Sequence, residues 1–243
     1  MKVNPEDLAR LLSVQGDDSA VDSLKHKVST LPIHATIAAL KQRRTEVADR
    51  LTASQTELGD VELAAERAEA DVVPVRERLI RNQARVDAGA MDPKALSNAI
   101  DEIAHLKQRI SDLEDTQLEA MDVLEMTSAQ VASLGEEVKE VEAELHAAVD
   151  ARDAEVGQLA SQARGFQATR AQTASAIAPE VLTLYEKIRA RSGGVGVARL
   201  EGRRCSGCGL EATVTDFNRY TAAPPDELLR CSECDRILVR RAL

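Results

Sequence analysis

Four cysteines in the C-terminal quarter of the chain form two pairs with the same spacing. Cys205 and Cys208 enclose two residues, as do Cys231 and Cys234, and 22 residues separate the pairs. Two thiolate pairs on tight turns can converge on one tetrahedral zinc ion, at about 2.3 Å per bond. A redox pair would instead be expected as one motif beside a thioredoxin-like βαβ unit. We therefore predict one structural Zn2+ ion, because four thiolates leave no coordination position for a substrate.

Arginines and two aromatic residues surround the cysteines. The aromatic residues are Phe217 and Tyr220. The arginines are Arg199, Arg203, Arg204, Arg219, Arg230, Arg236, Arg240 and Arg241. Arginine beside an exposed ring suits single-stranded RNA or DNA, because guanidinium groups contact phosphates and rings stack on bases. The alternative is that both rings fill a small core and the arginines balance acidic neighbours.

The elements that must position this site begin with two long helical runs. Apolar residues recur three and four apart over residues 37–86 and again over 96–148, the pattern of a coiled coil. Gly89 is expected to end the first helix, and Asp92 and Pro93 to start the next. Folding the runs at this turn pairs residues whose numbers add to 185. The resulting layers are Leu79/Leu106, Val75/Ile110, Val72/Leu113, Val61/Leu124, Leu51/Leu134, Val47/Val138 and Leu40/Leu145. One offset serves every layer, which predicts an intramolecular antiparallel hairpin.

Several local features modify this helical region. Polar residues fill the remaining seam positions: Arg44, Ser54, Asn82, Gln117 and Thr127. Pro74 is expected to kink or loosen the first arm. A short helix should open the chain at Pro5 and end at the Gly16-Asp17-Asp18 segment. Beyond Ala148 the seam shifts, and the second arm should continue toward Pro179.

The charges that flank the seam differ between the base and the tip. Near the base the register sets opposite charges against each other: Arg43 and Glu144, Arg50 and Glu137, Lys41 and Glu142. Toward the tip it gathers basic residues: Arg76, Arg78, Arg81, Arg85, Lys107 and Arg109. These side chains either point outward into solvent, with Arg85 pairing with Glu102, or form a docking site for phosphates or an acidic protein.

Composition separates the chain into two parts. Aromatic residues make up only 2% and charged residues 30%, which is typical of long helices. Residues 1–178 carry 20 Lys+Arg against 32 Asp+Glu, whereas residues 179–243 carry 11 against 9. We predict a mainly α fold, with a coiled-coil hairpin over 1–178 (its tip near 87–93) and a linker helix and small β zinc ribbon over 179–243. The strands of the ribbon should be residues 195–200 and 236–240.

Our expectations about cellular location and about catalysis both rest on features that the sequence lacks. No apolar run approaches the length needed to span a bilayer, and the first residues are not those of a signal peptide. We therefore expect a cytoplasmic protein without membrane insertion, in which disulfides are disfavoured. The four histidines are scattered, and Gly193-Gly194-Val195-Gly196 lacks the lysine and helix of a phosphate loop. We expect no enzymatic activity.

Several segments resemble one known family, the bacterial C4-type zinc-ribbon proteins with an N-terminal coiled-coil hairpin. The segments are residues 91–115, 184–189, 196–202 and 231–238. Each cysteine pair with the turn that it encloses is called a knuckle. Asp235 and Val239 depart from the family, which commonly has glycine and tyrosine at these positions. Asp235 is therefore expected to strain the second knuckle, Cys231 to Cys234. The resemblance implies adaptors of flagellar or type III secretion regulation that bind messenger RNA and an alternative sigma factor.

The sequence favours a non-catalytic adaptor or regulator that binds nucleic acid, a transcription-related or a secretion-related protein. The binding residues would be the ribbon arginines, Tyr220 and the basic residues of the tip. The alternative is a protein-only coiled-coil scaffold or chaperone-like adaptor, with the hairpin as its interaction surface. The exposed faces of the coil could also pair between chains and form an oligomer.

Overall fold

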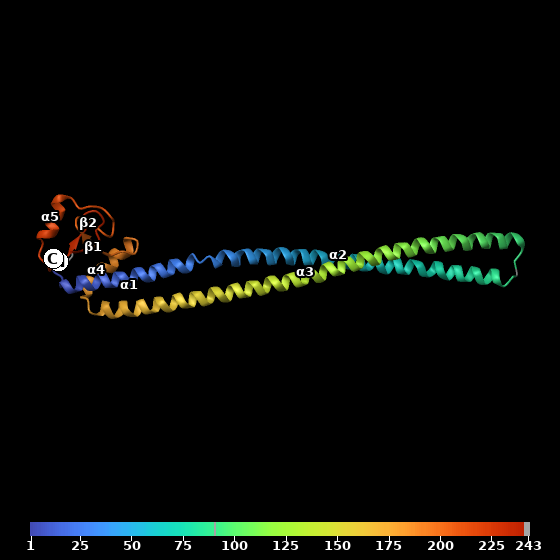
Figure 1. Cartoon of the computed structure of the whole chain (residues 1–243), viewed down its shortest axis with the longest axis horizontal. Helices are drawn as coiled ribbons and strands as arrows, with labels where there is room; N and C mark the ends of the chain where they lie inside the picture. The colour runs from blue at the N-terminus through green and yellow to red at the C-terminus, as the bar shows by residue number, and fades with distance from the viewer. Residues whose placement is uncertain (90, 241–243) are drawn as a thin grey trace. The chain divides into compact units, whose positions relative to one another are not determined.

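A computed structural model describes residues 1–89 and 91–240 (Figure 1). Ala90, within the predicted tip, and Arg241 lie outside the described residues. The helices are α1 (Pro5–Ser29), α2 (Ile33–Asp87), α3 (Pro93–Ser175), α4 (Pro179–Arg191) and α5 (Val214–Ala222). The strands are β1 (Val197–Glu201), β2 (Arg204–Cys205), β3 (Leu229–Arg230) and β4 (Ile237–Arg240). The predicted fold class, a long helical hairpin followed by a small sheet, is confirmed.

The chain divides into two compact units. One comprises residues 35–149, which are the paired parts of α2 and α3. The other comprises residues 1–34 and 150–243, so α1 belongs with the C-terminal region. No helix among the described residues combines the length and apolar character needed to cross a bilayer.

The hairpin follows the predicted register. Every residue of the seven predicted layers is buried or half-buried, and Val72 and Leu113 are both nearly inaccessible. Predicted ion pairs near the base also form: Arg43 lies 3.7 Å from Glu144, and Arg50 lies 3.6 Å from Glu137.

One ion pair of the hairpin differs from expectation. Glu142 accepts a hydrogen bond from Arg44 at 2.8 Å, so Arg44 takes the role predicted for Lys41. Arg44 therefore lies at the edge of the seam, where its charge stays half exposed. The second arm extends past Ala148 as predicted. Helix α2 continues without interruption through Pro74, which is exposed to solvent.

Helix α1 is longer than predicted, because it runs through Gly16 and Asp18 to Ser29. Glycine within a helix costs about 1 kcal/mol relative to alanine. Two contacts outweigh that cost: Val14 and Val21 are buried on one face, and Asp18 accepts hydrogen bonds from other helices.

The sheet has the strand order β2-β1-β4-β3, with β1 and β4 parallel. Side chains alternate between its faces, as the pleat of a strand requires. The neighbours Val197 and Ile237 pack into an apolar core with α1 and α4. The next pair, Ala198 and Leu238, packs into a second core that includes the cysteines.

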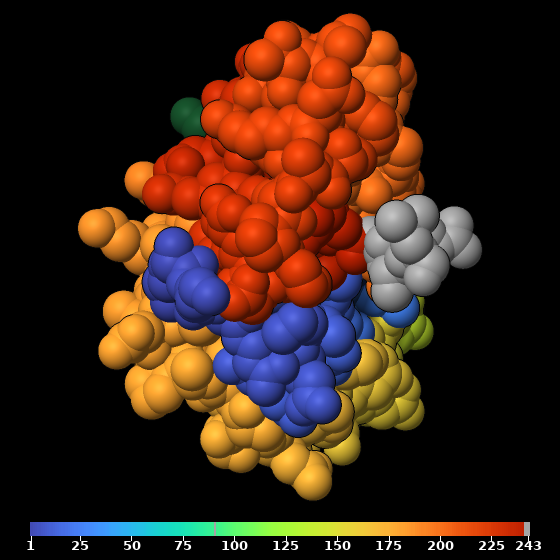
Figure 2. All heavy atoms as spheres, turned by 90° about the vertical axis from the view of Figure 1, so that its left-hand side faces the viewer, coloured from blue at the N-terminus to red at the C-terminus, as the bar shows by residue number. Residues whose placement is uncertain are grey.

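The first three residues lie against the C-terminal region within the same unit (Figure 2). Val3 N–H donates to the carbonyl of Asp226 at 2.7 Å, and Leu228 N–H donates to the carbonyl of Met1 at 3.1 Å. The ammonium of Lys2 lies 3.0 Å from the Asp226 carboxylate. These contacts join the first residues to the loop between α5 and β3.

Candidate metal centre

The structure brings the four cysteine thiols together. Sγ of Cys205 lies 4.0 Å from Sγ of Cys234, and Sγ of Cys208 lies 4.0 Å from Sγ of Cys231. All four sulfurs lie within 4.8 Å of one another. Four sulfurs bound to one tetrahedral zinc ion would be about 3.8 Å apart, given bonds of about 2.3 Å. The spacing fits one metal ion and is far longer than the S–S bond of a disulfide.

The two knuckles have the same backbone geometry. In each, the residue after the second cysteine donates its N–H to the carbonyl of the first: Gly209 to Cys205 at 2.8 Å, and Asp235 to Cys231 at 2.9 Å. Both donors are left-handed, with φ of 74° at Gly209 and 62° at Asp235. This conformation is easy for glycine and strained for aspartate, as predicted for Asp235.

Charged partners accompany the strained backbone of Asp235. Its carboxylate accepts hydrogen bonds from Arg230, at the end of β3, and from Arg191, at the end of α4. The second knuckle is thereby attached to α4.

Arg236 packs beside the first knuckle and fixes the connection between α4 and β1. Its guanidinium donates to the carbonyls of Val195, at 2.9 Å, and Ser192, at 2.6 Å. Its aliphatic part fills the space beside Gly207, where an added Cβ would lie only 2.7 Å from it. Gly207, between the first two cysteines, therefore permits the approach of Arg236.

As free thiols, Cys205, Cys231 and Cys234 differ in acidity. Burial raises the pKa of Cys231 to about 12, and it also raises the pKa of Cys205. Burial acts in the same direction at Cys234, but hydrogen bonds from Arg236 and from the Cys231 and Cys208 thiols outweigh it and lower the pKa to about 7. A metal ion would therefore have to displace protons at neutral pH, which makes binding pH-dependent.

Most of the arginines predicted to bind nucleic acid contact the protein itself. Six of the seven described ribbon arginines bind backbone carbonyls or carboxylates. The contacts are Arg203 to Ala212 O, Arg204 to Gly209 O and Glu211, Arg219 to Asp216, Arg230 to Asp235, Arg236 to Val195 O and Ser192 O, and Arg240 to Tyr220 O, Ala223 O and Pro224 O. Arg199 is exposed, and its side chain has no such contact among the described residues.

The two aromatic residues of the ribbon belong to its core. Tyr220 is 1% exposed, and its hydroxyl accepts a hydrogen bond of 2.9 Å from the N–H of Ser232. Phe217 is partly buried against the same cluster. The guanidinium of Arg219 lies 5.2 Å from the centre of the Tyr220 ring. The Tyr220 ring is therefore closed to stacking with a base.

The basic residues of the tip are partly paired. Arg76 hydrogen-bonds to Glu114 and Arg78 to Glu102, in both cases across the hairpin, and Arg81 lies 3.5 Å from Glu77. One alternative from the sequence was that Arg85 pairs with Glu102. In the structure Glu102 instead pairs with Arg78. Over the described residues, Lys107, Arg85 and Arg109 form no ion pair. The carboxylates of Glu114, Glu102 and Glu77 therefore offset part of the positive charge that the register predicts at the tip.

A buried polar network in α1 was not predicted. The hydroxyl of Tyr185, in α4, donates to the Asp18 carboxylate at 2.7 Å, and Arg170, in α3, donates to the same carboxylate at 2.8 Å. Burial raises the pKa of Tyr185. The signal was present in the sequence, since Gln15 and Asp18 interrupt the apolar face formed by Leu11, Val14 and Val21.

Gln15, in α1, also binds the α4–β1 connection. Its Nε2 donates to the carbonyl of Gly194 at 2.9 Å, and its Oε1 accepts from the N–H of Gly196 at 2.7 Å. The connection is therefore bonded both by Gln15 of α1 and by Arg236, which follows the second cysteine pair.

Comparison with known proteins finds a family model and relatives that each match most of the chain. A family model described as the CT398-like coiled coil hairpin domain matches residues 14–193. An uncharacterised protein of Mycobacterium tuberculosis is 29% identical over 240 residues, covering 99% of this chain and 98% of its own. An uncharacterised protein of Mycobacterium leprae is 26% identical, covering 90% of this chain and 94% of its own.

Solved structures share the fold. A protein from Mycobacterium smegmatis superposes with a TM-score of 0.85 at 31% identity, over 99% of this chain and all of its own. The CT398 protein of Chlamydia trachomatis gives a TM-score of 0.67 at 18% identity, over 97% of this chain and 98% of its own. At that identity the likeness concerns the fold alone.

Proposed function

The chain belongs to the family of CT398-like coiled coil hairpin proteins, and we propose that it is a non-catalytic protein adaptor whose ribbon is held by one zinc ion. In this proposal the hairpin presents the surface that partners bind. The ribbon stabilises the unit that contains α1, α4 and the end of α3. A transcription-related or secretion-related partner, as the family resemblance implies, remains compatible with this function.

The observation that carries the proposal is how the ribbon uses its arginines and its tyrosine. Nucleic-acid binding needs guanidinium groups free for phosphates and rings free for bases. Here six arginines bind the ribbon's own carbonyls and carboxylates, and Tyr220 is buried. A zinc ion with four thiolates also carries a formal charge of about −2, which offsets the small positive balance of this segment. These features favour a protein partner.

Zinc fits the centre because of its ligands and their spacing. Four thiolates in tetrahedral arrangement are a typical structural zinc site. The ligands would be Cys205, Cys208, Cys231 and Cys234. When bound, the ion cross-links the β1–β2 and β3–β4 segments, whose own apolar core is small. With all four positions taken by protein sulfurs, the ion would have no position for a substrate, which supports a non-catalytic role.

Nucleic-acid binding is the second candidate, supported by the exposed side chains of Arg199, Arg85, Arg109 and Lys107. The test is fluorescence anisotropy of zinc-verified protein against random single-stranded RNA and DNA, at low and at physiological salt. The adaptor proposal predicts no binding that persists at physiological salt, because unspecific phosphate contacts weaken steeply with ionic strength. Persistent binding that Arg199→Ala or Arg85→Ala weakens would instead establish the second candidate.

A further inference from the structure

Five large apolar side chains are exposed along one stretch of the hairpin. They are Val73 and Ile80 on α2, and Ile100, Leu118 and Met121 on α3, with exposed fractions between 51% and 67%. We call these five residues the apolar stripe. Large apolar side chains that recur on one side of a helix pair are candidates for an interaction surface, although charged residues lie between these five.

The spacing of these residues places them on one face of each helix. Val73, Ile80 and Asp87 are seven residues apart on α2, and Ile100, Lys107, Glu114 and Met121 are seven apart on α3. Residues seven apart lie on the same face of a coiled-coil helix.

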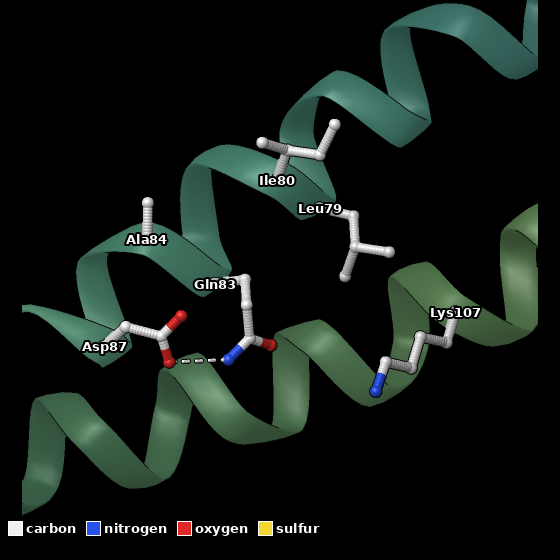
Figure 3. A pocket seen from close by; sticks show the side chains of 6 residues that line it. All are labelled: Leu79, Ile80, Gln83, Ala84, Asp87 and Lys107. Atoms are coloured by element: carbon white, nitrogen blue, oxygen red, sulfur yellow. Dashed lines mark hydrogen bonds between the residues drawn. The ribbon is translucent and has the colours of Figure 1, made fainter.

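Two contacts show that the two faces lie on the same side of the hairpin. Arg76, between Val73 and Ile80, hydrogen-bonds to Glu114. Nearer the tip, Ile80 and Lys107 line one hollow. The stripe therefore runs along one side of the hairpin, and on α2 the side chain of Ile80 points outward, away from α3 (Figure 3). Ile100 and Met121 are three heptads apart, so the stripe is about 32 Å long.

The hollow on this side of the hairpin has a volume of about 450 Å³ and is lined by Leu79, Ile80, Gln83, Ala84, Asp87 and Lys107 (Figure 3). Leu79 and Gln83 project from α2 toward α3, and Gln83 donates to Asp87 at 2.9 Å. The hollow is open and lined mainly by carbon, as expected of a groove that receives side chains from another helix.

Carboxylates surround the end of the stripe farther from the tip. In the 185 register Met121 lies level with position 64 and Leu118 with position 67. The α2 residues on this face are Glu62, Glu66 and Glu69, spaced three and four apart and leading to Val73, and Glu125 follows Met121 by one turn. None of these four carboxylates forms an ion pair with another described residue. Their charge is left for a partner to match.

We propose that the apolar stripe binds a basic amphipathic helix of a partner protein, which lies along this side of the hairpin and contacts both α2 and α3. Apolar side chains of that helix would cover the stripe at three- and four-residue spacing, and flanking lysines or arginines would face the glutamates. The proposal rests on the proposed adaptor function and names the chemistry of its partner. A second copy of this chain fits less well, because its own hairpin is rich in glutamate and would place like charges against these carboxylates.

The test uses a fluorescein-labelled synthetic helix with leucines three and four apart, flanked by lysines. One control peptide has the same residues in scrambled order, and another has glutamates in place of the lysines. The full zinc-loaded chain is titrated as wild type, Met121→Gln and Ile80→Gln. Met126→Gln is the matched control, since Met126 is 65% exposed but lies off the stripe. Circular dichroism verifies that each variant remains helical.

The proposal predicts binding of the basic amphipathic peptide alone, with the dissociation constant raised about tenfold by Met121→Gln or Ile80→Gln and unchanged by Met126→Gln. Glu62→Gln with Glu66→Gln should also weaken binding, whereas Glu119→Gln should not. Equal binding to all variants, or preference for the acidic peptide, would overturn it. Sedimentation that showed a dimer lost in Met121→Gln would overturn it in favour of a second copy.

The adaptor function is tested separately. If the peptide fails to bind and RNA also fails to bind at physiological salt, the stripe proposal is wrong while the adaptor proposal stands. If RNA binds persistently, the adaptor proposal itself is wrong, whatever the peptide does.

Discussion

The side-chain oxygen of Gln15 accepts a hydrogen bond of 2.7 Å from the backbone N–H of Gly196, which lies 181 positions further along the chain. This bond joins the first helix to the residue that precedes β1. With the bond from Gln15 to the carbonyl of Gly194, it satisfies two backbone groups that would otherwise be left without partners. The N-terminal helix therefore takes part in building the unit that holds the cysteines.

Substitution of Gln15 tests that role. Gln15→Leu keeps a side chain of similar size in a site that is 7% exposed, but leaves the Gly196 N–H and the Gly194 carbonyl unpaired. We expect the free energy of unfolding to fall by about 2 kcal/mol. Chemical denaturation measures it, with Gln172→Leu, at an exposed helical position, as the control. Equal stability of both variants would show that the bonds are dispensable.

The metal centre predicts a pH-dependent affinity. Cys231 and Cys205 have raised pKa values, and the pKa of Cys234 is about 7, so a metal ion must displace protons. Zinc affinity should therefore already weaken as the pH falls below the raised pKa values of Cys231 and Cys205, and should weaken more steeply below pH 7, where Cys234 is protonated as well. A competing chelator with a colorimetric readout measures this. Affinity independent of pH would contradict thiolate ligation.

Loss of one ligand tests the structural role of the metal. Cys231→Ser should abolish stoichiometric zinc and melt the ribbon, while the hairpin, in the other compact unit, keeps its helical signal. Metal analysis and near-ultraviolet circular dichroism follow the two effects, with Ser232→Ala in the same turn for comparison. A fully ordered ribbon in Cys231→Ser would refute a structural ion.

The left-handed conformation of Asp235 predicts an ordered series of variants. Asp235→Ala should lower ribbon stability by about 1 kcal/mol more than Asp235→Asn, because both remove the charge that Arg191 and Arg230 bind, but asparagine tolerates positive φ better. Denaturation of zinc-loaded protein gives the difference. If alanine proved the better tolerated of the two, the backbone at this position would not be strained.

Ser54 shows how a polar seam residue affects the hairpin. It is 3% exposed, and its hydroxyl has no hydrogen-bond partner within residues 1–89 and 91–240. Ser54→Ala should raise the free energy of unfolding by about 1 kcal/mol more than Ser128→Ala, an exposed control that reports helix propensity alone. Equal gains would mean that the Ser54 hydroxyl has a partner in solution.

The hairpin could be predicted because its determinants are periodic and local. The spacing of apolar residues gave both the helices and the 185 register, and the ion pairs of Arg43 and Arg50 followed from it. The cysteine spacing likewise predicted a convergent site.

Other features depend on contacts between segments distant in sequence. Gly16-Asp17-Asp18 resembled a helix end, but Asp18 is bound by Tyr185 and Arg170, which lie more than 150 residues away. The ribbon arginines resembled a nucleic-acid surface, because the sequence does not show which carbonyls they will meet. Arg240, for example, binds carbonyls at the end of α5, a helix that the sequence did not indicate.

The most direct test of the adaptor function compares the full chain with a variant that has a shorter hairpin. Removal of residues 58–78 and 107–127 takes three heptads from each arm and preserves the 185 register of the rest. Both proteins are used as zinc-loaded baits in lysate of the source cells, with and without nuclease treatment, and bound proteins are quantified by mass spectrometry. The account predicts a partner that the full chain retains and the shortened chain loses. Equal capture by both baits, or capture abolished by nuclease, would contradict it.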